Sequence, residues 1–373
     1  MAQEIKKEIK TELMTLNLGP QHPSTHGVLR LVLTLDGERI VKAEPHLGYL
    51  HRGVEKLCEN LQLSRIIPLF DRLDYVANIN NELSLVMAVE KLMDIRVPER
   101  AEYIRVIMAE FNRILSHLIW LGAFIQDIGL LGTVFLYGFR EREKIQRMME
   151  AVTGARMHYH YFRYGGVAQD LTEEFPEEAL KYLDNFDSVL DEFEEMIEDN
   201  EIFLVRTKGI GALSAEDAIN FGVSGPMLRA SGVKIDLRKL EPYSVYPHFD
   251  FDVPVEENGD CFDRYKVRMV EMRQSARIIR QALQSLPGGL VRTPVPRRIK
   301  PPEGEVYMRT EHAKGEFGVY LISDGSHRAY RLKIRSPSFV NLMVAPKMLE
   351  GMLIPDLIAT LGSIDIVMGC IDR

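Results

Sequence analysis

The sequence predicts an α+β protein that is mostly α-helical, with a central antiparallel helix bundle flanked by small β-sheets. Three observations predict this fold. Apolar residues recur at helical spacing over long stretches in the middle of the chain, and short connections join these stretches. Strand-like runs occur near the N-terminus and again near the C-terminus. An Asp-Gly turn lies between two of these runs in each region, at 36–37 and at 324–325.

The N-terminal part predicts a small sheet. Residues 13–18 form a short strand-like run, and two further runs, 28–35 and 39–43, are joined by Asp36-Gly37. An Asp-Gly pair between two such runs is a strong hairpin signal. We therefore expect a β region over residues 1–48.

Residues 49–205 predict the helix bundle. Apolar positions repeat at helical spacing over residues 73–93 and again over 134–152. Between them, a longer pattern covers 98–128 and begins at Pro98, a residue favoured at the first helical position. Long helices with short connections favour antiparallel packing.

An acidic segment completes the bundle region. Residues 173–201 contain 13 Asp and Glu but only one basic residue, Lys181, whereas the whole chain carries a net charge of −8. The acidity is therefore local. Apolar residues recur every three or four positions within it, which predicts one amphipathic helix. We interpret it as a solvated outer helix, and an acidic docking face for a partner is the alternative.

Residues 206–373 predict a mixed α/β region packed on the bundle, so that the three parts form one continuous domain. Residues 206–260 are rich in Gly and Pro, residues 262–285 form a basic helical pattern, and 286–304 form a Pro-rich loop. The remaining predicted elements are strands at 305–309, 317–323 and 330–334 and a helix at 348–361.

Composition excludes several classes of protein. The net charge of −8 argues against a nucleic-acid binder. Three Cys in 373 residues cannot form a disulfide framework or hold a four-Cys cluster. The sequence has no P-loop, no Gly-rich dinucleotide fingerprint after a strand and no Cys pair at metal spacing. We therefore expect the chain to bind no nucleotide, metal or cluster alone.

Residues 118–139 are nearly free of charge over a bilayer-spanning length. However, Asp127 lies near the middle, where a charge is costly, and several Gly residues interrupt the segment. A buried helix of the bundle is the better interpretation, so we expect the protein to meet a membrane only through partners.

Four polar clusters could carry chemistry. Residues 19–27 place two His, including His26, in a Pro- and Gly-bounded turn. Residues 70–75 place Asp, Arg and Tyr where a helix is expected to start, and residues 153–161 gather His and Tyr after a helix end. The fourth candidate is a single residue, Asp127, in the apolar stretch 118–139. Structural explanations are a solvated turn, a helix cap and a packed loop, whereas a His, a Tyr and a buried Asp suit a substrate that accepts protons at two oxygens.

At these residues the sequence resembles a known family along nearly its whole length: the D-type subunit of bacterial NADH-quinone oxidoreductase, respiratory complex I, itself similar to the large subunit of nickel-iron hydrogenases. The matching stretches are GPQHPSTHGVLRL from Gly19, HLGYLHRGVEK from His46, DRLDY from Asp71, FRERE from Phe139, SGPMLRASGVKIDLRK from Ser224 and DIVMGCIDR at the C-terminal end.

The resemblance implies a hydrogenase-like fold without the metal centre. The hydrogenase Cys positions correspond to Asp74, Ala77, Val367 and Cys370, of which only the last is Cys. In this family, a quinone headgroup binds in the cavity that the metal centre occupies in hydrogenases. The resemblance therefore implies that His26 and Tyr75 are ligands and proton donors of the headgroup, and that Asp127 is the partner of His26.

The resemblance also implies the surroundings of this site. Arg72 and His158 match residues near a terminal [4Fe-4S] cluster that a neighbouring subunit holds. The implied partners are a small cluster-bearing B-like subunit, C-like and I-like subunits of the peripheral arm, and an H-like subunit of the membrane arm. The implied location is the cytoplasmic face of the bacterial cell membrane, within a proton-pumping complex. Alternatives are a hydrogenase large subunit, disfavoured by the missing Cys residues, and an inert scaffold.

Overall fold

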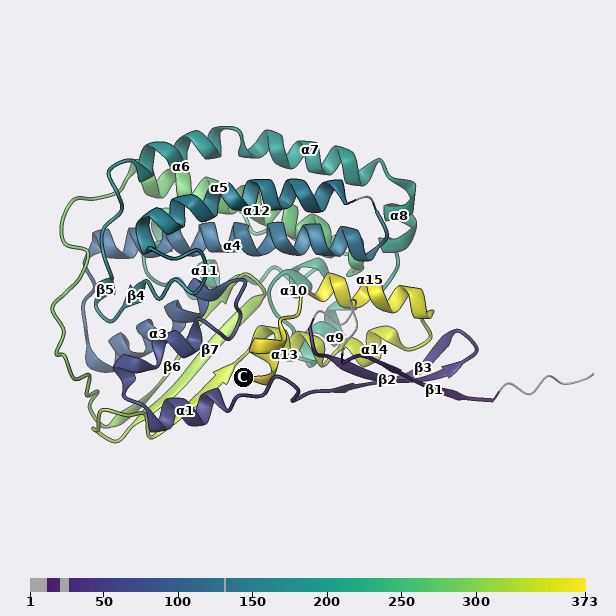
Figure 1. Cartoon of the computed structure of the whole chain (residues 1–373), viewed down its shortest axis with the longest axis horizontal. Coiled ribbons are helices and arrows are strands. Elements are labelled where there is room, and N and C mark those ends of the chain that lie inside the picture. The colour runs from purple at the N-terminus through teal and green to yellow at the C-terminus, as the bar shows by residue number, and fades with distance from the viewer. Residues whose placement is uncertain (1–11, 21–26, 131) are drawn as a thin grey trace, which may run out of the picture.

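Three long helices form the centre of the molecule, which is seen in a computed structural model describing residues 12–20, 27–130 and 132–373. Helix α4 (Glu99–Asp127) packs against α5 (Thr133–Thr153) and α12 (Cys261–Gln284) (Figure 1), and most of its residues are buried. Helices α6 (Phe175–Asp184) and α7 (Phe186–Glu198) cover this layer. The predicted bundle is therefore present.

A three-stranded sheet lies beneath the bundle. Strands β6 (Gly304–His312), β7 (Gly315–Ser323) and β8 (Arg331–Arg335) are antiparallel in that order, and helix α3 (Asn78–Met93) packs on β6 and β7. His312 pairs with Gly315, so a two-residue turn at Ala313-Lys314 joins β6 to β7. This turn carries Lys314 into the interior.

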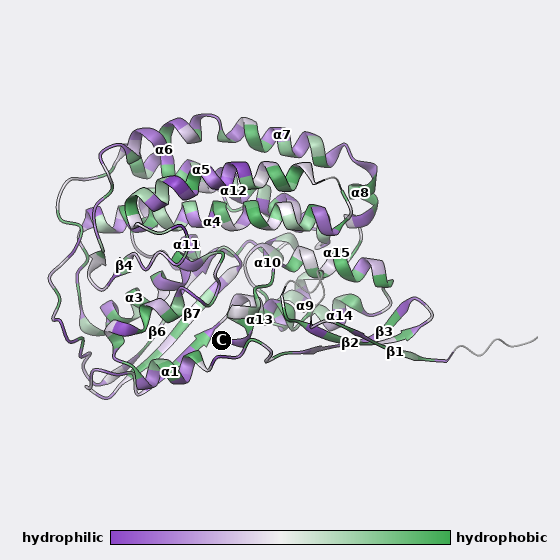
Figure 2. Ribbon diagram, viewed as in Figure 1, coloured by the Kyte–Doolittle hydropathy of each residue, from purple (hydrophilic) through white to green (hydrophobic). Residues whose placement is uncertain are grey.

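A second sheet is formed by the N-terminal strands β1 (Met14–Leu18), β2 (Arg30–Asp36) and β3 (Arg39–His46). Alternate residues of β2 are buried in an apolar core shared with helices α14 (Ala345–Leu349) and α15 (Ile354–Ile364). Hydrophobic residues are frequent along α15, which contributes to this core (Figure 2). The hairpin predicted at Asp36-Gly37 is confirmed.

Shorter elements connect these layers. The helices are α1 (Val54–Asn60), α2 (Ile67–Phe70), α8 (Glu201–Thr207), α9 (Ala215–Asn220), α10 (Pro226–Ala230), α11 (Leu237–Leu240), α13 (Pro337–Leu342) and α16 (Met368–Asp372), with 3₁₀ turns at Leu63–Arg65 and Tyr246–His248. Strands β4 (Phe162–Arg163) and β5 (Gly166–Val167) form a small hairpin.

The predicted class, α+β and mostly α with small antiparallel sheets, is confirmed. Three element predictions were wrong. The helix expected from residue 73 begins at Asn78, because the Asp74 side chain binds the backbone N–H groups of Val76 and Ala77 in a turn. The acidic helix expected within residues 173–201 is divided into α6 and α7. The last helix is divided into α14 and α15 by Gly351, whose φ is +80°.

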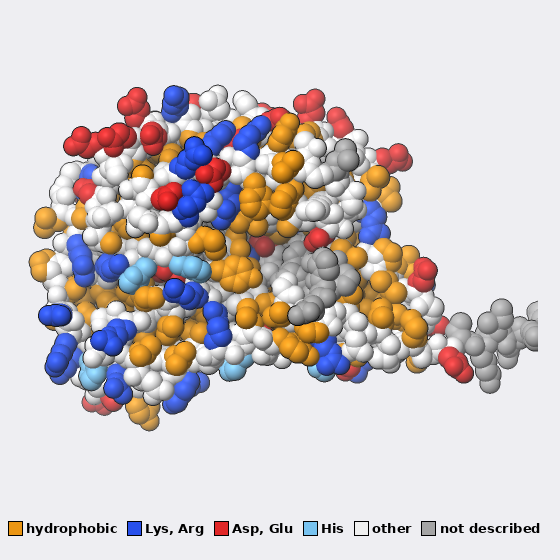
Figure 3. Space-filling model, viewed as in Figure 1, with side chains coloured by type: hydrophobic (Ala, Val, Ile, Leu, Met, Phe, Trp, Pro, Cys, Tyr) orange, Lys and Arg blue, Asp and Glu red, His pale blue; other side chains and the backbone are white. Residues whose placement is uncertain are grey.

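The acidic segment is an outer layer, as interpreted from its sequence. Acidic side chains gather over α6 and α7 on the surface (Figure 3). The inner side of α7 also pairs with the basic helix α12, since Arg273 binds Glu194 at 2.8 Å and Lys266 binds Glu198 at 2.9 Å. Part of the charge is thus neutralised within the chain.

No helix among the described residues is both long enough and apolar enough to cross a membrane. The apolar stretch 118–139 is shared between the end of α4 and the start of α5, with a turn between them.

Candidate functional site

The C-terminal segment joins two distant parts of the sequence. The Asp372 carboxylate accepts hydrogen bonds from the backbone N–H groups of Gly48 at 2.8 Å and Leu50 at 2.7 Å. The His51 ring Nδ1 lies 2.6 Å from the Asp372 carbonyl oxygen. The stretches HLGYLHRGVEK and DIVMGCIDR therefore form one unit.

The stretch DRLDY belongs to the same unit. Arg52 donates to the carbonyl oxygen of Arg72 at 2.6 Å and to that of Gly369 at 3.3 Å. A Cβ atom on Gly369 would lie 2.6 Å from the Leu73 carbonyl oxygen, so no side chain fits there. The N-terminal stretch also reaches this segment, because a Cβ on Gly27 would lie 3.3 Å from the Met368 side chain.

Tyr75 lies at the edge of this unit and is partly exposed. Its ring packs against Gly369, where an added Cβ would lie 3.3 Å from the ring atom Cε1. Burial and the neighbouring Asp74 carboxylate raise the pKa of the Tyr75 phenol. The phenol therefore keeps its proton at neutral pH and can donate it in a hydrogen bond.

Asp74 points away from solvent and meets a buried lysine. The Lys314 ammonium lies 3.1 Å from Asp74, 3.4 Å from Asp365 and 2.9 Å from the Ser116 hydroxyl. Burial alone would raise the pKa of Asp74, but the charge of Lys314 keeps it below its ordinary value. Burial also lowers the pKa of the adjacent His312 to about 3, so this imidazole is neutral.

His158 lies on the other side of the same turn. Its Nδ1 is 3.2 Å from the carbonyl oxygen of Asp71, the residue before Arg72. Arg72 is exposed and donates to the carbonyl oxygen of Pro68 at 2.6 Å. The structure thus brings Arg72, Tyr75 and His158 to one turn.

Comparisons with known proteins show the family of the chain. The model of the family described as the 49 Kd subunit of respiratory-chain NADH dehydrogenase matches residues 127–301 and 293–373. The chain belongs to this family. It is 54% identical to the D-type subunit of the NADH-quinone oxidoreductase of Dehalococcoides mccartyi, over 98% of this chain and all of that protein. The D-type subunits of Desulforamulus reducens, at 54%, and Geotalea uraniireducens, at 53%, are similar over 98% and 97% of this chain and 99% of their own length.

Family membership confirms that the chain is a subunit of a respiratory-chain oxidoreductase. The individual site residues are a separate matter. His26 lies outside the described residues. Asp127 is the last residue of α4, and it is partly exposed rather than buried as the sequence suggested, because the helix reaches the surface there.

Two of the positions that the resemblance matches to hydrogenase Cys residues, Asp74 and Cys370, have partners within this chain. Asp74 pairs with Lys314, and the Cys370 thiol lies 2.8 Å from the Ser336 hydroxyl. Burial raises the pKa of Cys370 to about 12, so it is a thiol rather than a metal-binding thiolate. Across the part of the chain that the structure describes, no three His, Cys, Asp or Glu side chains are grouped to hold a metal.

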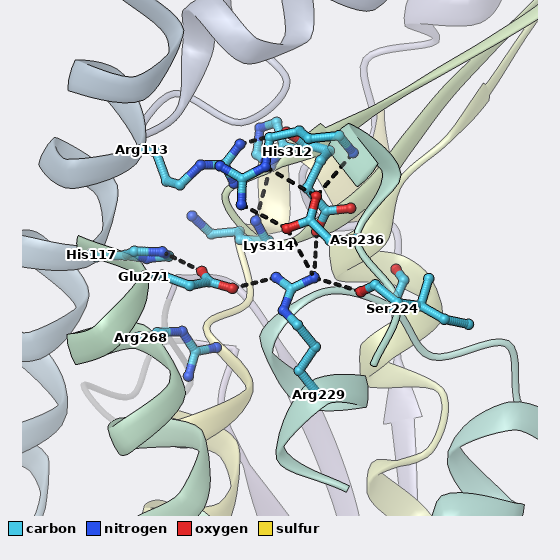
Figure 4. A network of polar contacts seen from close by, with 12 residues as sticks. Arg113, His117, Ser224, Arg229, Asp236, Arg268, Glu271, His312 and Lys314 are labelled. Carbon is cyan, nitrogen blue, oxygen red and sulfur yellow. Dashed lines mark hydrogen bonds and ion pairs between the residues drawn. The ribbon is translucent and has the colours of Figure 1, made fainter. Parts of the chain in front are cut away.

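The structure also contains a buried network of charged side chains that the sequence did not predict (Figure 4). Glu271 on α12 is hydrogen-bonded to His117 at 2.9 Å and forms an ion pair with Arg229. Arg229 also binds Glu311 at 2.8 Å. The network continues through Asp236, Arg238, Glu110 and Arg113.

The signal for this network was weak. Glu110, Arg113 and His117 recur at intervals of three and four residues on α4, which is also the pattern of a solvated helix face. They are buried against residues from distant parts of the sequence, namely Glu271 on α12, Arg238 on α11 and Glu311 on β6.

Proposed function

We propose that this chain forms the quinone headgroup site of a proton-pumping NADH:quinone oxidoreductase. Reduction of a quinone to a quinol takes up two electrons and two protons. In the proposal, Tyr75 gives a hydrogen bond and a proton to one carbonyl oxygen, and His26 does the same at the other. Asp127 is the proposed partner of His26.

The observation that carries the proposal is the setting of Tyr75. Its phenol is protonated and partly exposed, on a turn whose backbone is bound by Arg52 and by the Asp74 side chain. A donor held on a fixed backbone loses little conformational freedom when a carbonyl oxygen binds. Gly369 keeps one face of the ring free of any side chain at that position.

The neighbours of Tyr75 fit electron delivery from outside the chain. Arg72 is an exposed cation, and His158 is a partly exposed imidazole on the loop that contacts this turn. A cation or a protonatable group beside a cluster favours its reduced form. We therefore propose that the [4Fe-4S] cluster of a B-like subunit lies against this side of the turn.

The assembly follows from the same proposal. C-like and I-like subunits would complete the peripheral arm, and an H-like subunit would connect it to the membrane. This arrangement would hold the chain on the cytoplasmic face of the cell membrane.

Tyr75→Phe in the assembled complex tests the proposal. This variant removes one hydroxyl and should lower the rate of quinone reduction by about 10²-fold or more, the usual contribution of a positioned proton donor. NADH should still reduce the terminal cluster, observed by electron paramagnetic resonance. Tyr330→Phe, at a 68% exposed tyrosine, is the matched control and should keep the full rate.

The same experiment addresses the scaffold alternative. An inert scaffold would show equal quinone reduction in Tyr75→Phe and Tyr330→Phe, and that result would overturn the proposal. Loss of cluster reduction in Tyr75→Phe would also contradict it, because the hydroxyl is proposed to act after the electrons arrive.

A further inference from the structure

Two buried acids face each other beside the proposed site. Asp71 precedes Arg72 on the turn, and Glu82 lies on α3; neither side chain is exposed to solvent. Their carboxyl groups lie close enough for each to shift the pKa of the other. Two ionised carboxylates have only acceptor atoms, so they can form a hydrogen bond with each other only if they share a proton.

The backbone around the pair shows which atoms share that proton. Asp71 Oδ2 accepts the N–H of His160 at 2.9 Å, and Glu82 Oε2 accepts the N–H of Phe162 at 2.8 Å. The other two oxygens, Asp71 Oδ1 and Glu82 Oε1, are buried, and the surrounding backbone and side chains offer them no hydrogen-bond donor. A proton on Glu82 Oε1 donated to Asp71 Oδ1 therefore satisfies all four oxygens.

The charged groups around the pair have other partners. Arg163, on the loop, donates to the carbonyl oxygens of His160 and Phe162, and Arg105 of α4 binds Glu90 at 2.6 Å. Arg72 and His158 face Asp71 from the turn and the loop, and the Tyr159 phenol is close to it. Burial and the charge of Asp71 raise the pKa of Glu82 well above its ordinary value.

The pair holds a backbone that is unfavourable by itself. His158 and His160 have φ values of +56° and +44°, in the left-handed region that residues with a Cβ rarely occupy. Such conformations persist only when surrounding contacts impose them. Here the two acids bind the N–H groups of residues 160 and 162, and the Asp71 carbonyl contacts His158.

We propose that Glu82 is a positioning residue that carries a proton at neutral pH, and that this proton holds the loop of His158 on the turn of Arg72 and Tyr75. The importance of that loop for electron delivery rests on the proposed function. The protonated acid pair itself does not, because it follows from the contacts of the four oxygens.

Two substitutions at Glu82 distinguish a protonated carboxyl group, which donates a hydrogen bond, from an ionised one. In Glu82→Gln, the amide N–H₂ replaces the O–H donor toward Asp71, and the amide oxygen still accepts from Phe162. In Glu82→Met, donor and acceptor are lost at similar side-chain length. Hydrogen exchange of the peptide covering residues 158–163, measured by mass spectrometry on the purified complex, reports whether the loop is held.

We expect Glu82→Gln to exchange at the wild-type rate and Glu82→Met to exchange on the order of tenfold faster, the effect of one lost hydrogen bond. Glu90→Gln is the matched control on the same helix. Glu90 is also buried, but it binds the Arg105 guanidinium and the N–H of Gly165. The same substitution should loosen the structure there, because it leaves the buried Arg105 with only its longer ion pair to Glu102, at 3.5 Å.

Faster exchange in Glu82→Gln, equal to that in Glu82→Met, would overturn the inference, because it would mean that Glu82 acts as an anion. Equal exchange rates in the wild type, Glu82→Gln and Glu82→Met would also overturn the inference, because the acid pair would then not hold the loop. A second readout is the pH dependence of the midpoint potential of the partner's cluster. This dependence should change in Glu82→Met and match that of the wild type in Glu82→Gln. Tyr75→Phe with unchanged quinone reduction would defeat the proposed function and leave the exchange result standing.

Discussion

Asp71 and Asp74 lie on one buried turn, yet their carboxyl groups are compensated in different ways. Asp74 meets a fixed positive charge, the Lys314 ammonium at 3.1 Å. Asp71 meets a second carboxyl group, Glu82, with which we propose that it shares a proton. A buried lysine paired with carboxylates keeps its charge across neutral pH, whereas a proton exchanges with solvent as the structure opens. The Tyr75 side of the turn is thus held by a charge and the His158 side by a proton.

Removing the fixed charge should produce the largest effect. Lys314→Met leaves Asp74 and Asp365 buried without their common cation, since Lys314 binds them at 3.1 and 3.4 Å. Breaking a buried ion pair in this way costs about 3–5 kcal/mol. We expect a large loss of assembled complex and a lower denaturant midpoint for the hydrogen-exchange protection of α3.

Lys347→Met provides the control for this experiment. Lys347 also binds a carboxylate, Asp217, but its side chain is 52% exposed. An exposed pair contributes at most about 1 kcal/mol, so assembly should be unchanged. Adding Asp74→Asn to Lys314→Met should recover part of the loss, because one uncompensated charge is removed. Normal stability of Lys314→Met alone would contradict a structural role for this ion pair.

The pH dependence of stability should differ in sign between the two acids. Because Lys314 keeps the pKa of Asp74 below its ordinary value of 3.8, this pair stabilises the fold above pH 3.8 and is lost as the pH falls further. The pKa of Glu82 is raised above its ordinary value of 4.5, so its contribution is complete below pH 4.5 and declines as the pH rises.

Denaturant series on the complex at pH 5 to 9 check this difference through the exchange protection of α3. Relative to wild type, Glu82→Gln should become more stable with rising pH, by at most about 1.4 kcal/mol per pH unit, because its amide does not titrate. Asp74→Asn should show no such trend in this range. Parallel curves for wild type and Glu82→Gln would mean that Glu82 does not hold a proton in the folded chain.

The two acids also show how far sequence reasoning extends. Asp71, Arg72, Asp74 and Tyr75 were singled out because they share one short stretch, and His158 because it lies in a His- and Tyr-rich loop. Their proximity could be anticipated from the family resemblance. The partners that define the chemistry could not: Lys314 comes from a hairpin tip far along the chain, and Glu82 lies in a helix where a polar residue normally indicates a solvated face.

The fold shows the same division. The Asp36-Gly37 hairpin and the extents of α4, α5 and α12 follow from local patterns, and they were predicted closely. The start of α3 was wrong because the Asp74 side chain binds the backbone of the preceding turn. Such competition between side chain and helix depends on what packs around the turn, and the sequence pattern does not contain that information.

The smallest effect on stability is expected for an ion pair that is exposed to solvent. Asp191 on α7 binds Arg273 on α12 at 2.6 Å, but its side chain is 71% exposed, and Arg273 also binds Glu194. Asp191→Asn should change stability by less than about 0.5 kcal/mol, and added salt should reduce even this difference. The measurement is the same denaturant series, now following the exchange protection of α7. A loss comparable to that in Lys314→Met would mean that the α7–α12 face is shielded from solvent in the assembled complex, and the contrast between buried and exposed charges would then not apply to this helix.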